Sequence, residues 1–323
     1  MNKEIKIIMY HYVRDLQASD YPAIKGLDVN IFEKQLEYLT NQYDILEMED
    51  IISAYKTGDD SMLPDQGVLL TFDDGYIDHY QEVYPILKKY GVQGSFFPNG
   101  MAVKEHKLLT VNRIHFILAA AEAKDKYFYR ELVQECFSLM DEYRNQGVRL
   151  KSNEEYYTEL AIPNRWDPGE VIFVKRLLQN ALPENIRTAI AMKLFKKYVG
   201  IPEDAFAKKL YMNEEQIREM KRDGMFFGLH GYDHYWLGKL TPEKMHEDIE
   251  KALDCFQDVI DRECWVMNYP YGNYSAEVLD YIREIGCVLG VSVVAETARL
   301  GTHNPLILPR YDANDVFPKG DKV

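Results

Sequence analysis

Short apolar runs alternate with helix-forming stretches at both ends of this chain, and the alternation limits the folds open to it. The apolar runs cover residues 5–10, 67–71, 95–97, 225–229, 264–269 and 287–291. Segments with apolar residues at helical spacing lie between most of these runs. Strands joined through helices pair in parallel and carry the helices outside. We therefore expect an α/β fold in the form of a (β/α) barrel.

The segment 104–212 does not follow this alternation. It is rich in helix formers and long polar side chains, with few short apolar runs. We interpret residues 1–103 and 213–323 as the barrel and residues 104–212 as a mainly helical insertion. Insertions between the strand ends of a parallel α/β scaffold emerge on the face that carries catalytic groups. We expect a cap over that face or, as the alternative, an oligomer interface.

The charge of the chain disfavours several kinds of partner. Its 323 residues carry a formal net charge of -14 at pH 7. Binding to nucleic acid, to an anionic membrane surface or to a polyanion relies on excess Lys and Arg. A neutral or mildly basic substrate fits this chain better, and we expect no nucleic-acid partner.

Cysteine spacing and hydropathy bear on the compartment. The cysteines are Cys136, Cys255, Cys264 and Cys287. They form no CxxC pair, so we expect reduced thiols and no disulfide framework. No stretch reaches the ~20 apolar residues that span a bilayer, so we expect no membrane span. The apolar run at residues 7–9 is too short for a signal-peptide core, and with Met1 as the native start the expected location is the cytoplasm.

Polar groups follow four of the expected strands. They are His11, the pair Asp73-Asp74, His230 and the run Tyr269–Gly272. The carboxyl ends of parallel strands meet at one edge, so we expect these groups to form one site. His79 and His246 lie in polar helical stretches instead, where we expect exposure to solvent.

The types and spacing of these residues favour a metal site. His230 and His234 are four residues apart, and Asp74 supplies a carboxylate. Two imidazoles and a carboxylate are ligands that Zn²⁺, Co²⁺ or Ni²⁺ accept, with a position open for water. Taken singly, an HxxxH pair is often a coincidence and Asp-Asp-Gly is often a surface turn. Their joint occurrence at strand ends favours the metal.

Several motifs, in order along the chain, resemble those of the polysaccharide deacetylases, the nodulation-protein-B homology domain of carbohydrate esterase family four. The motifs are TFDDGY at 71–76, HGYDH at 230–234 and YPYG at 269–272. The resemblance covers Lys3–Gly100 and Asn213–Asp315 and leaves out the insertion. It implies a distorted, seven-stranded (β/α) barrel.

The resemblance also implies roles for the residues of these motifs. Asp73 corresponds to the catalytic base. The metal ligands are Asp74, His230 and His234, which would hold one divalent ion, zinc first, with cobalt or nickel as alternatives. Water bound to this ion is the implied nucleophile. The backbone N–H of Tyr271 is the implied donor to the oxyanion.

The expected acid comes from an unusual place. Many family members carry a Leu-x-His motif near the C-terminus, which is absent here, while His11 ends the first strand. This order resembles the permuted poly-N-acetylglucosamine deacetylases, so we assign the acid to His11; the alternative is a structural role at the strand end. The Arg that often opens the third motif is replaced by Asn268. Arg310 near Asp73 and Asp312 near His11 are the expected substitutes, although such a pair can also be a structural ion pair.

The resulting hypothesis is a metal-dependent hydrolase that N-deacetylates an amino sugar or glycan precursor. The expected cap, together with the expected lack of a signal peptide, favours a small or chain-end sugar, such as a nucleotide- or lipid-linked precursor. One alternative is a deformylase or cyclic-amide hydrolase of the same fold. Another is a catalytically silent carbohydrate-binding protein, which Asp73 and the complete ligand set argue against. The motifs describe the reaction centre and therefore do not identify the sugar or the acyl group.

Overall fold

The computed structural model describes residues 1–123, 127–164 and 167–319. These residues form two compact units. Unit 1 comprises Met1–Asp15, Gly26–Lys107 and the described residues from Ala207 onward. Unit 2 comprises Leu16–Lys25 and Leu108–Phe206.

The loop Leu16–Lys25 belongs to unit 2, whereas the sequence analysis counted it with the barrel. Ile24 is buried there. The ring of Tyr21 packs edge-on against Phe116 at 5.1 Å and against Phe206 at 5.8 Å. A short loop carries no periodic pattern that would reveal such distant ring contacts, so the boundary drawn from the sequence needs correction at this loop.

The strands of unit 1 close into a ring of mostly parallel pairs. The paired strands are β1 (Glu4–Tyr10), β5 (Gly67–Asp74), β6 (Ser95–Pro98) and β7 (Phe226–Phe227). A bridge from Leu229 to Met267 leads to β8 (Trp265–Asn268), which pairs with β9 (Cys287–Val291). A bridge from Val291 to Leu308 leads to β11 (Tyr311–Asp312), which pairs with β1. At two places the ring is held by a single-residue bridge in place of a continuous strand pair, and the barrel is distorted there. The predicted α/β barrel fold is confirmed.

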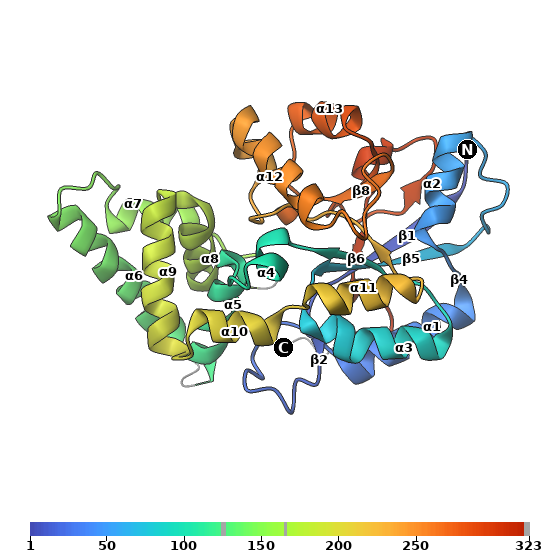
Figure 1. Cartoon of the computed structure of the whole chain (residues 1–323). Helices are drawn as coiled ribbons and strands as arrows, with labels where there is room; N and C mark the ends of the chain where they lie inside the picture. Colours follow the sequence, from blue (N-terminus) through green and yellow to red (C-terminus); the bar gives the residue numbers. More distant parts are fainter. Residues whose placement is uncertain (124–126, 165–166, 320–323) are drawn as a thin grey trace. The chain divides into compact units, whose positions relative to one another are not determined.

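Helices cover the outside of this ring (Figure 1). One group is α1 (Val29–Gln42), α3 (Tyr84–Tyr90) and α11 (Glu214–Arg222). Another is α12 (Pro242–Cys255) and α13 (Ala276–Glu284), which contact each other. Apolar residues at helical spacing bury the inner face of α1, where Phe32, Leu36 and Leu39 are buried. The helical pattern thus places one apolar face of the helix on the strands.

Shorter elements complete the description of unit 1. The strands among them are β2 (Val13–Arg14), β3 (Leu27–Asp28), β4 (Asp44–Ile45) and β10 (Ala298–Arg299). The helices are α2 (Met48–Thr57), α4 (Gly100–Lys104) and the π-helix η1 (His79–Val83). The 3-10 turns are η3 (Leu237–Lys239), η4 (Pro270–Gly272), η5 (Pro305–Ile307) and η6 (Ala313–Asp315).

The strand β5 carries both acidic residues of the first motif. All eight of its residues are buried. The sequence left open a surface turn at Asp73-Asp74, but these residues continue the strand, since they pair with Phe97 and Pro98 of β6. The turn begins at Gly75, whose φ of 72° suits a residue without a side chain. The strand therefore delivers both carboxylates to the end of the barrel.

The regular elements of unit 2 among its described residues are helices, joined by loops that include Leu16–Lys25. Its helices are α5 (Thr110–Glu122), α6 (Phe128–Asn145), α7 (Asn153–Leu160), α8 (Gly169–Arg176), η2 (Leu177–Ala181) and α9 (Glu184–Tyr198), together with the first residues of α10 (Glu203–Leu210), up to Phe206. The ring of Phe206 lies 4.6 Å from Phe116 and 5.3 Å from Phe195, which ties α5, α9 and α10 together. Among the described residues, no helix has both the length and the apolar character that crossing a membrane requires.

Candidate active site

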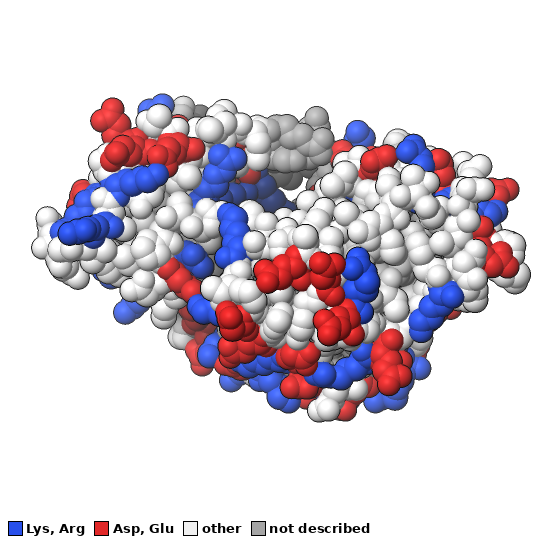
Figure 2. Space-filling view, turned by 90° about the horizontal axis from the view of Figure 1, so that it is seen from above, with Lys and Arg blue, Asp and Glu red and all other residues white. Residues whose placement is uncertain are grey.

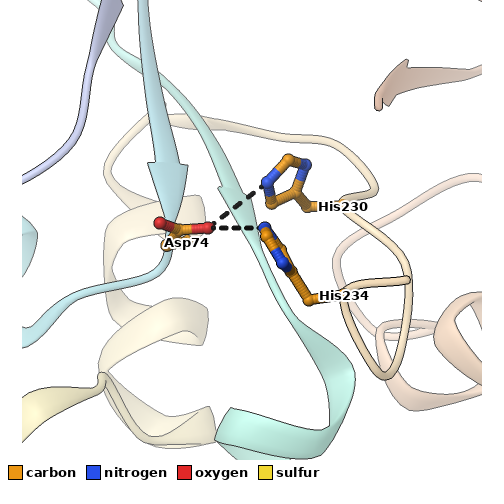
Figure 3. A group of neighbouring side chains, drawn as sticks. All are labelled: Asp74, His230 and His234. Carbon is orange, nitrogen blue, oxygen red and sulfur yellow. Dashed lines mark ion pairs between the residues drawn. The ribbon is translucent and has the colours of Figure 1, made fainter. Parts of the chain in front are cut away.

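The three expected metal ligands lie together in unit 1 (Figure 3). Asp74 ends β5, and His230 and His234 project toward it from the loop that follows β7. Oδ1 of Asp74 lies 3.3 Å from Nε2 of each histidine. The three candidate ligand atoms lie within 4.8 Å of one another, and all three residues are buried. A carboxylate and two imidazoles at this spacing suit one divalent cation.

The hydrogen bonds around these side chains leave their inner atoms to face a cation. Oδ2 of Asp74 accepts from the Tyr76 hydroxyl at 2.5 Å. Nδ1–H of His230 donates to the Asn268 carbonyl oxygen at 2.7 Å, so the lone pair of Nε2 points inward. Within the described part of the chain, the buried Oδ1 of Asp74 has no hydrogen-bond partner. A buried acceptor without a donor is unfavourable, and a bound cation removes that penalty. The donor set therefore fits a divalent metal ion.

The protonation states also suit metal binding. Burial alone would raise the pKa of Asp74, but the imidazoles of His230 and His234 hold it well below its ordinary range. Burial lowers the pKa of His234, against the opposing charge of Asp74. The carboxylate is thus ionised and the His234 ring neutral near pH 7, which are the forms that bind metal.

The backbone around this group is strained. In the described part of the chain, the non-glycine residues with positive φ are Asp74, His106, His234 and Tyr271. Three of these belong to the site, with φ values of 72° for Asp74, 56° for His234 and 58° for Tyr271. A left-handed conformation is uncommon for residues with a side chain and costs about 1–3 kcal/mol, so the surrounding structure must hold it. Strain gathered at one place is typical of functional sites.

A buried carboxylate on α12 holds the loop that carries both histidines. Asp248 accepts the backbone N–H of Tyr232 at 3.0 Å and that of Asp233 at 2.8 Å. A side-chain carbon at Gly231 would lie 2.9 Å from Oδ2 of Asp248, so the carboxylate fills the space beside this glycine. Burial raises the pKa of Asp248 to about 6, although the two N–H groups lower it. Nothing in the sequence singles out Asp248, because an acidic residue in a polar helix gives no local signal.

Asp73 is bound by a buried arginine from the other end of the chain. Nη1 of Arg310 donates to Oδ1 of Asp73 at 2.8 Å, and Nη2 donates to Oδ2 at 2.9 Å. The remaining donors of the guanidinium bind Thr71, Asn268 and the carbonyl oxygen of Ser292. Burial alone would raise the pKa of Asp73, but Arg310 and His11 lower it to about 2. The carboxylate is therefore ionised over the whole neutral range.

His11 lies on the other side of Asp73. β1 and β5 pair in register up to Tyr10 and Phe72, and His11 and Asp73 are the next residues along. Nε2 of His11 lies 3.8 Å from Oδ2 of Asp73, and the His11 side chain is 43% exposed. An imidazole that touches both solvent and the carboxylate can exchange protons with a ligand at this edge.

Asp312 pairs with Met9 of β1, two residues before His11. Its Oδ1 accepts the backbone N–H of Asn314 at 2.9 Å and so caps η6. No ion pair between Asp312 and His11 occurs within the residues that the structure describes. Aspartate readily caps a short turn that follows it, and the role of Asp312 beside His11 stays a prediction.

Tyr271 lies beside the metal ligands together with a tryptophan. Its ring stacks on Trp236 with centroids 4.7 Å apart, and it meets His234 edge-on at 4.5 Å. Nε1 of Trp236 is buried and has no hydrogen-bond partner among the described residues. The two rings thus lie next to the candidate metal ligands, and Lys239 Nζ lies 4.4 Å from the centre of the Trp236 ring.

His79 occupies a position that differs from the expectation. It is fully buried rather than solvated, and Nε2–H donates to the carbonyl oxygen of His11 at 2.8 Å. The polar residues around His79 in the sequence suggested an exposed helix. The tyrosines at helical spacing, Tyr76, Tyr80 and Tyr84, are the signal that could have indicated a buried aromatic face.

The surface charges that Figure 2 shows have no simple separation by sign. Acidic and basic side chains are interspersed on this face of the molecule.

Comparison with known families agrees with this geometry. The family model described as "Polysaccharide deacetylase" matches residues 60–149 and 187–290, which is more than half of the chain. The chain belongs to the polysaccharide deacetylase family, as its motifs predicted. The match extends into the predicted insertion from both sides, whereas the resemblance of the motifs stops at Gly100 and resumes at Asn213.

Individual relatives are distant. The chain is 19% identical over 290 residues to YxkH of Bacillus subtilis (strain 168), a protein named for the polysaccharide deacetylases. The alignment covers 90% of this chain, and the chain spans 64% of the length of that relative.

Two solved structures share the fold. The Streptococcus pyogenes deacetylase PplD, in complex with acetate, matches with a TM-score of 0.58 at 17% identity, over 97% of this chain and 93% of that chain. A de-N-acetylase from Aggregatibacter actinomycetemcomitans matches with a TM-score of 0.51 at 16% identity, over 96% and 94%. At these identities the likeness concerns the fold alone.

Proposed function

We propose that this protein hydrolyses the N-acetyl group of an amino-sugar or glycan precursor, with one divalent metal ion, zinc in the first place. The observation that carries the proposal is the buried set of Asp74, His230 and His234 beside an ionised Asp73. PplD is described in complex with acetate, and a second neighbour is named a de-N-acetylase. The first description supports acetate as the product, and the second supports the bond between an acetyl group and nitrogen as the bond that is cut.

The roles of the residues follow from the chemistry of an amide. A bound divalent ion would polarise the acyl oxygen and make water more acidic. Asp73 takes the proton of the attacking water, since it is ionised and held in place by Arg310. His11 gives a proton to the departing nitrogen, since it touches both Asp73 and solvent. The net reaction adds water across the C–N bond and yields a carboxylate and an amine.

Two further groups would act on the substrate. The backbone N–H of Tyr271 is the proposed donor to the acyl oxygen as it gains negative charge. The stacked rings of Trp236 and Tyr271 lie 4.7 Å apart and would pack against one face of a sugar ring. The acidic excess of the chain favours a neutral or amine-bearing sugar over a polyanion.

The test is product release by the metal-loaded full chain. Nucleotide-linked, lipid-linked and free N-acetyl amino sugars are incubated with the protein, and acetate and the amine are measured by mass spectrometry. Release of acetate by the wild type, with a rate at least about 10²-fold lower in Asp73→Asn, supports the proposal. Release of formate from N-formyl analogues alone would replace it with the deformylase alternative. Sugar binding without any release would replace it with the carbohydrate-binding alternative.

A further inference from the structure

A buried histidine that takes no part in the chemistry above is tied to the proposed acid. Nε2 of His79 lies 2.8 Å from the carbonyl oxygen of His11. A carbonyl oxygen only accepts, so His79 must carry its proton on Nε2 and donate it. His79 is 0% exposed, and its Nδ1 has no partner among the residues that the structure describes.

The surroundings of His79 are aromatic. Its ring centroid lies 5.6 Å from those of Phe72 and Tyr76 and 5.7 Å from that of Phe96. Burial among these rings lowers the pKa of His79 to about 4, against the opposing charges of Asp74 and Asp73 and the bond to His11. A phenylalanine or leucine would pack well in such a place. Among the residues that the structure describes, the polar contact that this side chain adds is the bond to the main chain of His11.

His79 also connects with the strand that carries the acidic pair. Its backbone N–H donates to the Tyr76 carbonyl oxygen at 3.0 Å, and the Tyr76 hydroxyl donates to Asp74. It begins the π-helix η1, a rare element that often marks functional places. One residue, through its backbone N–H and its side chain, thus joins the turn after β5 to the end of β1.

The His11 ring needs support from its own main chain because its side chain is partly exposed. β1 ends at Tyr10, and the His11 side chain is 43% exposed, so few contacts hold its ring. Its distance of 3.8 Å to Asp73 depends on the main chain that precedes β2. Proton transfer requires a geometry of a few tenths of an ångström, and a misplacement of about 1 Å can cost about 10²-fold in rate.

We propose that His79 is a positioning residue, which fixes the main chain of His11 and thereby aims the His11 imidazole at the departing nitrogen. This inference rests on the proposed function, in which His11 is the acid. His79 itself touches neither substrate nor the candidate metal.

The experiment compares two variants of the metal-loaded full chain. His79→Leu removes the donor at similar volume, and His79→Gln keeps an N–H donor at the reach of Nε2. We measure kcat/KM on an N-acetyl amino sugar and on an activated aryl acetate, whose leaving group needs no proton. His79→Leu is expected to lose about 10²-fold on the amide and less than about threefold on the ester, with His79→Gln near the wild type. The metal content stays at the wild-type level.

Each outcome of this comparison supports or overturns the positioning role of His79. Equal losses of His79→Leu on amide and ester, or an amide rate in His79→Gln as low as in His79→Leu, would overturn the positioning role. His11→Ala runs in parallel: if it shows no selective loss on the amide, the assignment of the acid fails and the role of His79 falls with it.

A measurement on the wild type keeps the inference testable if the variants do not fold. ¹⁵N NMR of the histidine side chains at pH 7 is expected to show His79 as a neutral ring with a slowly exchanging proton on Nε2. A proton on Nδ1, or a charged ring, would contradict the bond to His11 and with it the inference.

Discussion

Arg310 and Asp73 are joined by two parallel hydrogen bonds of 2.8 and 2.9 Å, although 237 residues separate them in the sequence. The guanidinium is 1% exposed, and every one of its N–H groups has an acceptor. Such a fork fixes the orientation of the carboxylate as well as its charge. Arg310 therefore orients Asp73. The sequence suggested this residue for that role, because Asn268 stands where the third motif often has an arginine.

Removal of that arginine is expected to destabilise the fold. Arg310→Met leaves the buried Asp73 charge unpaired, which should lower the free energy of unfolding by about 3–5 kcal/mol. Urea denaturation at pH 7 measures the change. Arg299→Met is the matched control, because Arg299 pairs with Glu4 at 3.0 Å but is half exposed, and it should lose less than about 1 kcal/mol. Similar losses in both variants would contradict the buried pair as a stabilising contact.

Single substitutions of the candidate ligands should remove the metal together with activity. His234→Ala, His230→Ala and Asp74→Ala each leave two protein ligands, too few for a stable site. Elemental analysis after dialysis is expected to find less than one tenth of the wild-type content, as an order of magnitude. His246→Ala on α12 serves as the control and should keep its metal. A stoichiometric metal content in His234→Ala would show that the ligand set is different.

Asp73→Asn separates the base from the metal site. The amide is nearly isosteric, but it cannot take a proton from water. Turnover should fall about 10²–10⁴-fold, the range for loss of a general base, while the metal content stays unchanged. Steady-state kinetics with elemental analysis of the same sample checks both halves. A rate near that of the wild type would move the base to another residue.

Asp248→Asn tests the carboxylate that holds the histidine loop. An asparagine can accept only one of the two N–H groups, and its own NH₂ group faces the other. We expect the affinity for the metal to fall about 10–100-fold, as for other groups that orient ligands. Competition with a chelator measures this affinity. Asp254→Asn, on the same helix but exposed and paired with Arg262, should leave it unchanged.

The burial of His79 predicts a pH dependence of stability. Its pKa of about 4 in the folded state lies below the ordinary value of 6.5, so the neutral ring stabilises the fold above about pH 6.5. This contribution is lost as the pH falls from 6.5 through 4, by about 3 kcal/mol, because each pKa unit corresponds to about 1.4 kcal/mol. Urea denaturation between pH 7 and 4 should show a steeper loss in the wild type than in His79→Leu. Equal slopes would mean that His79 is not buried in its neutral form.

The alternation of apolar runs was enough to predict the α/β barrel, and the local motifs were enough to predict the metal group. Asp74 is the last residue of its strand, and His230 and His234 share one short loop. Their joint placement depends on strand order and on a few backbone angles close by in the chain. The sequence also suggested Arg310 as a partner of Asp73, because Asn268 stands where the third motif often has an arginine and another residue must then orient the base.

Only the tertiary structure decided the contacts that support this group. Asp248 reaches the histidine loop from a helix, and His79 reaches the carbonyl oxygen of His11 from a π-helix. The physical reason is that these contacts depend on how helices and strand ends pack in three dimensions. Amphipathic spacing records which face of an element is buried, but it does not record which buried polar atom meets which partner.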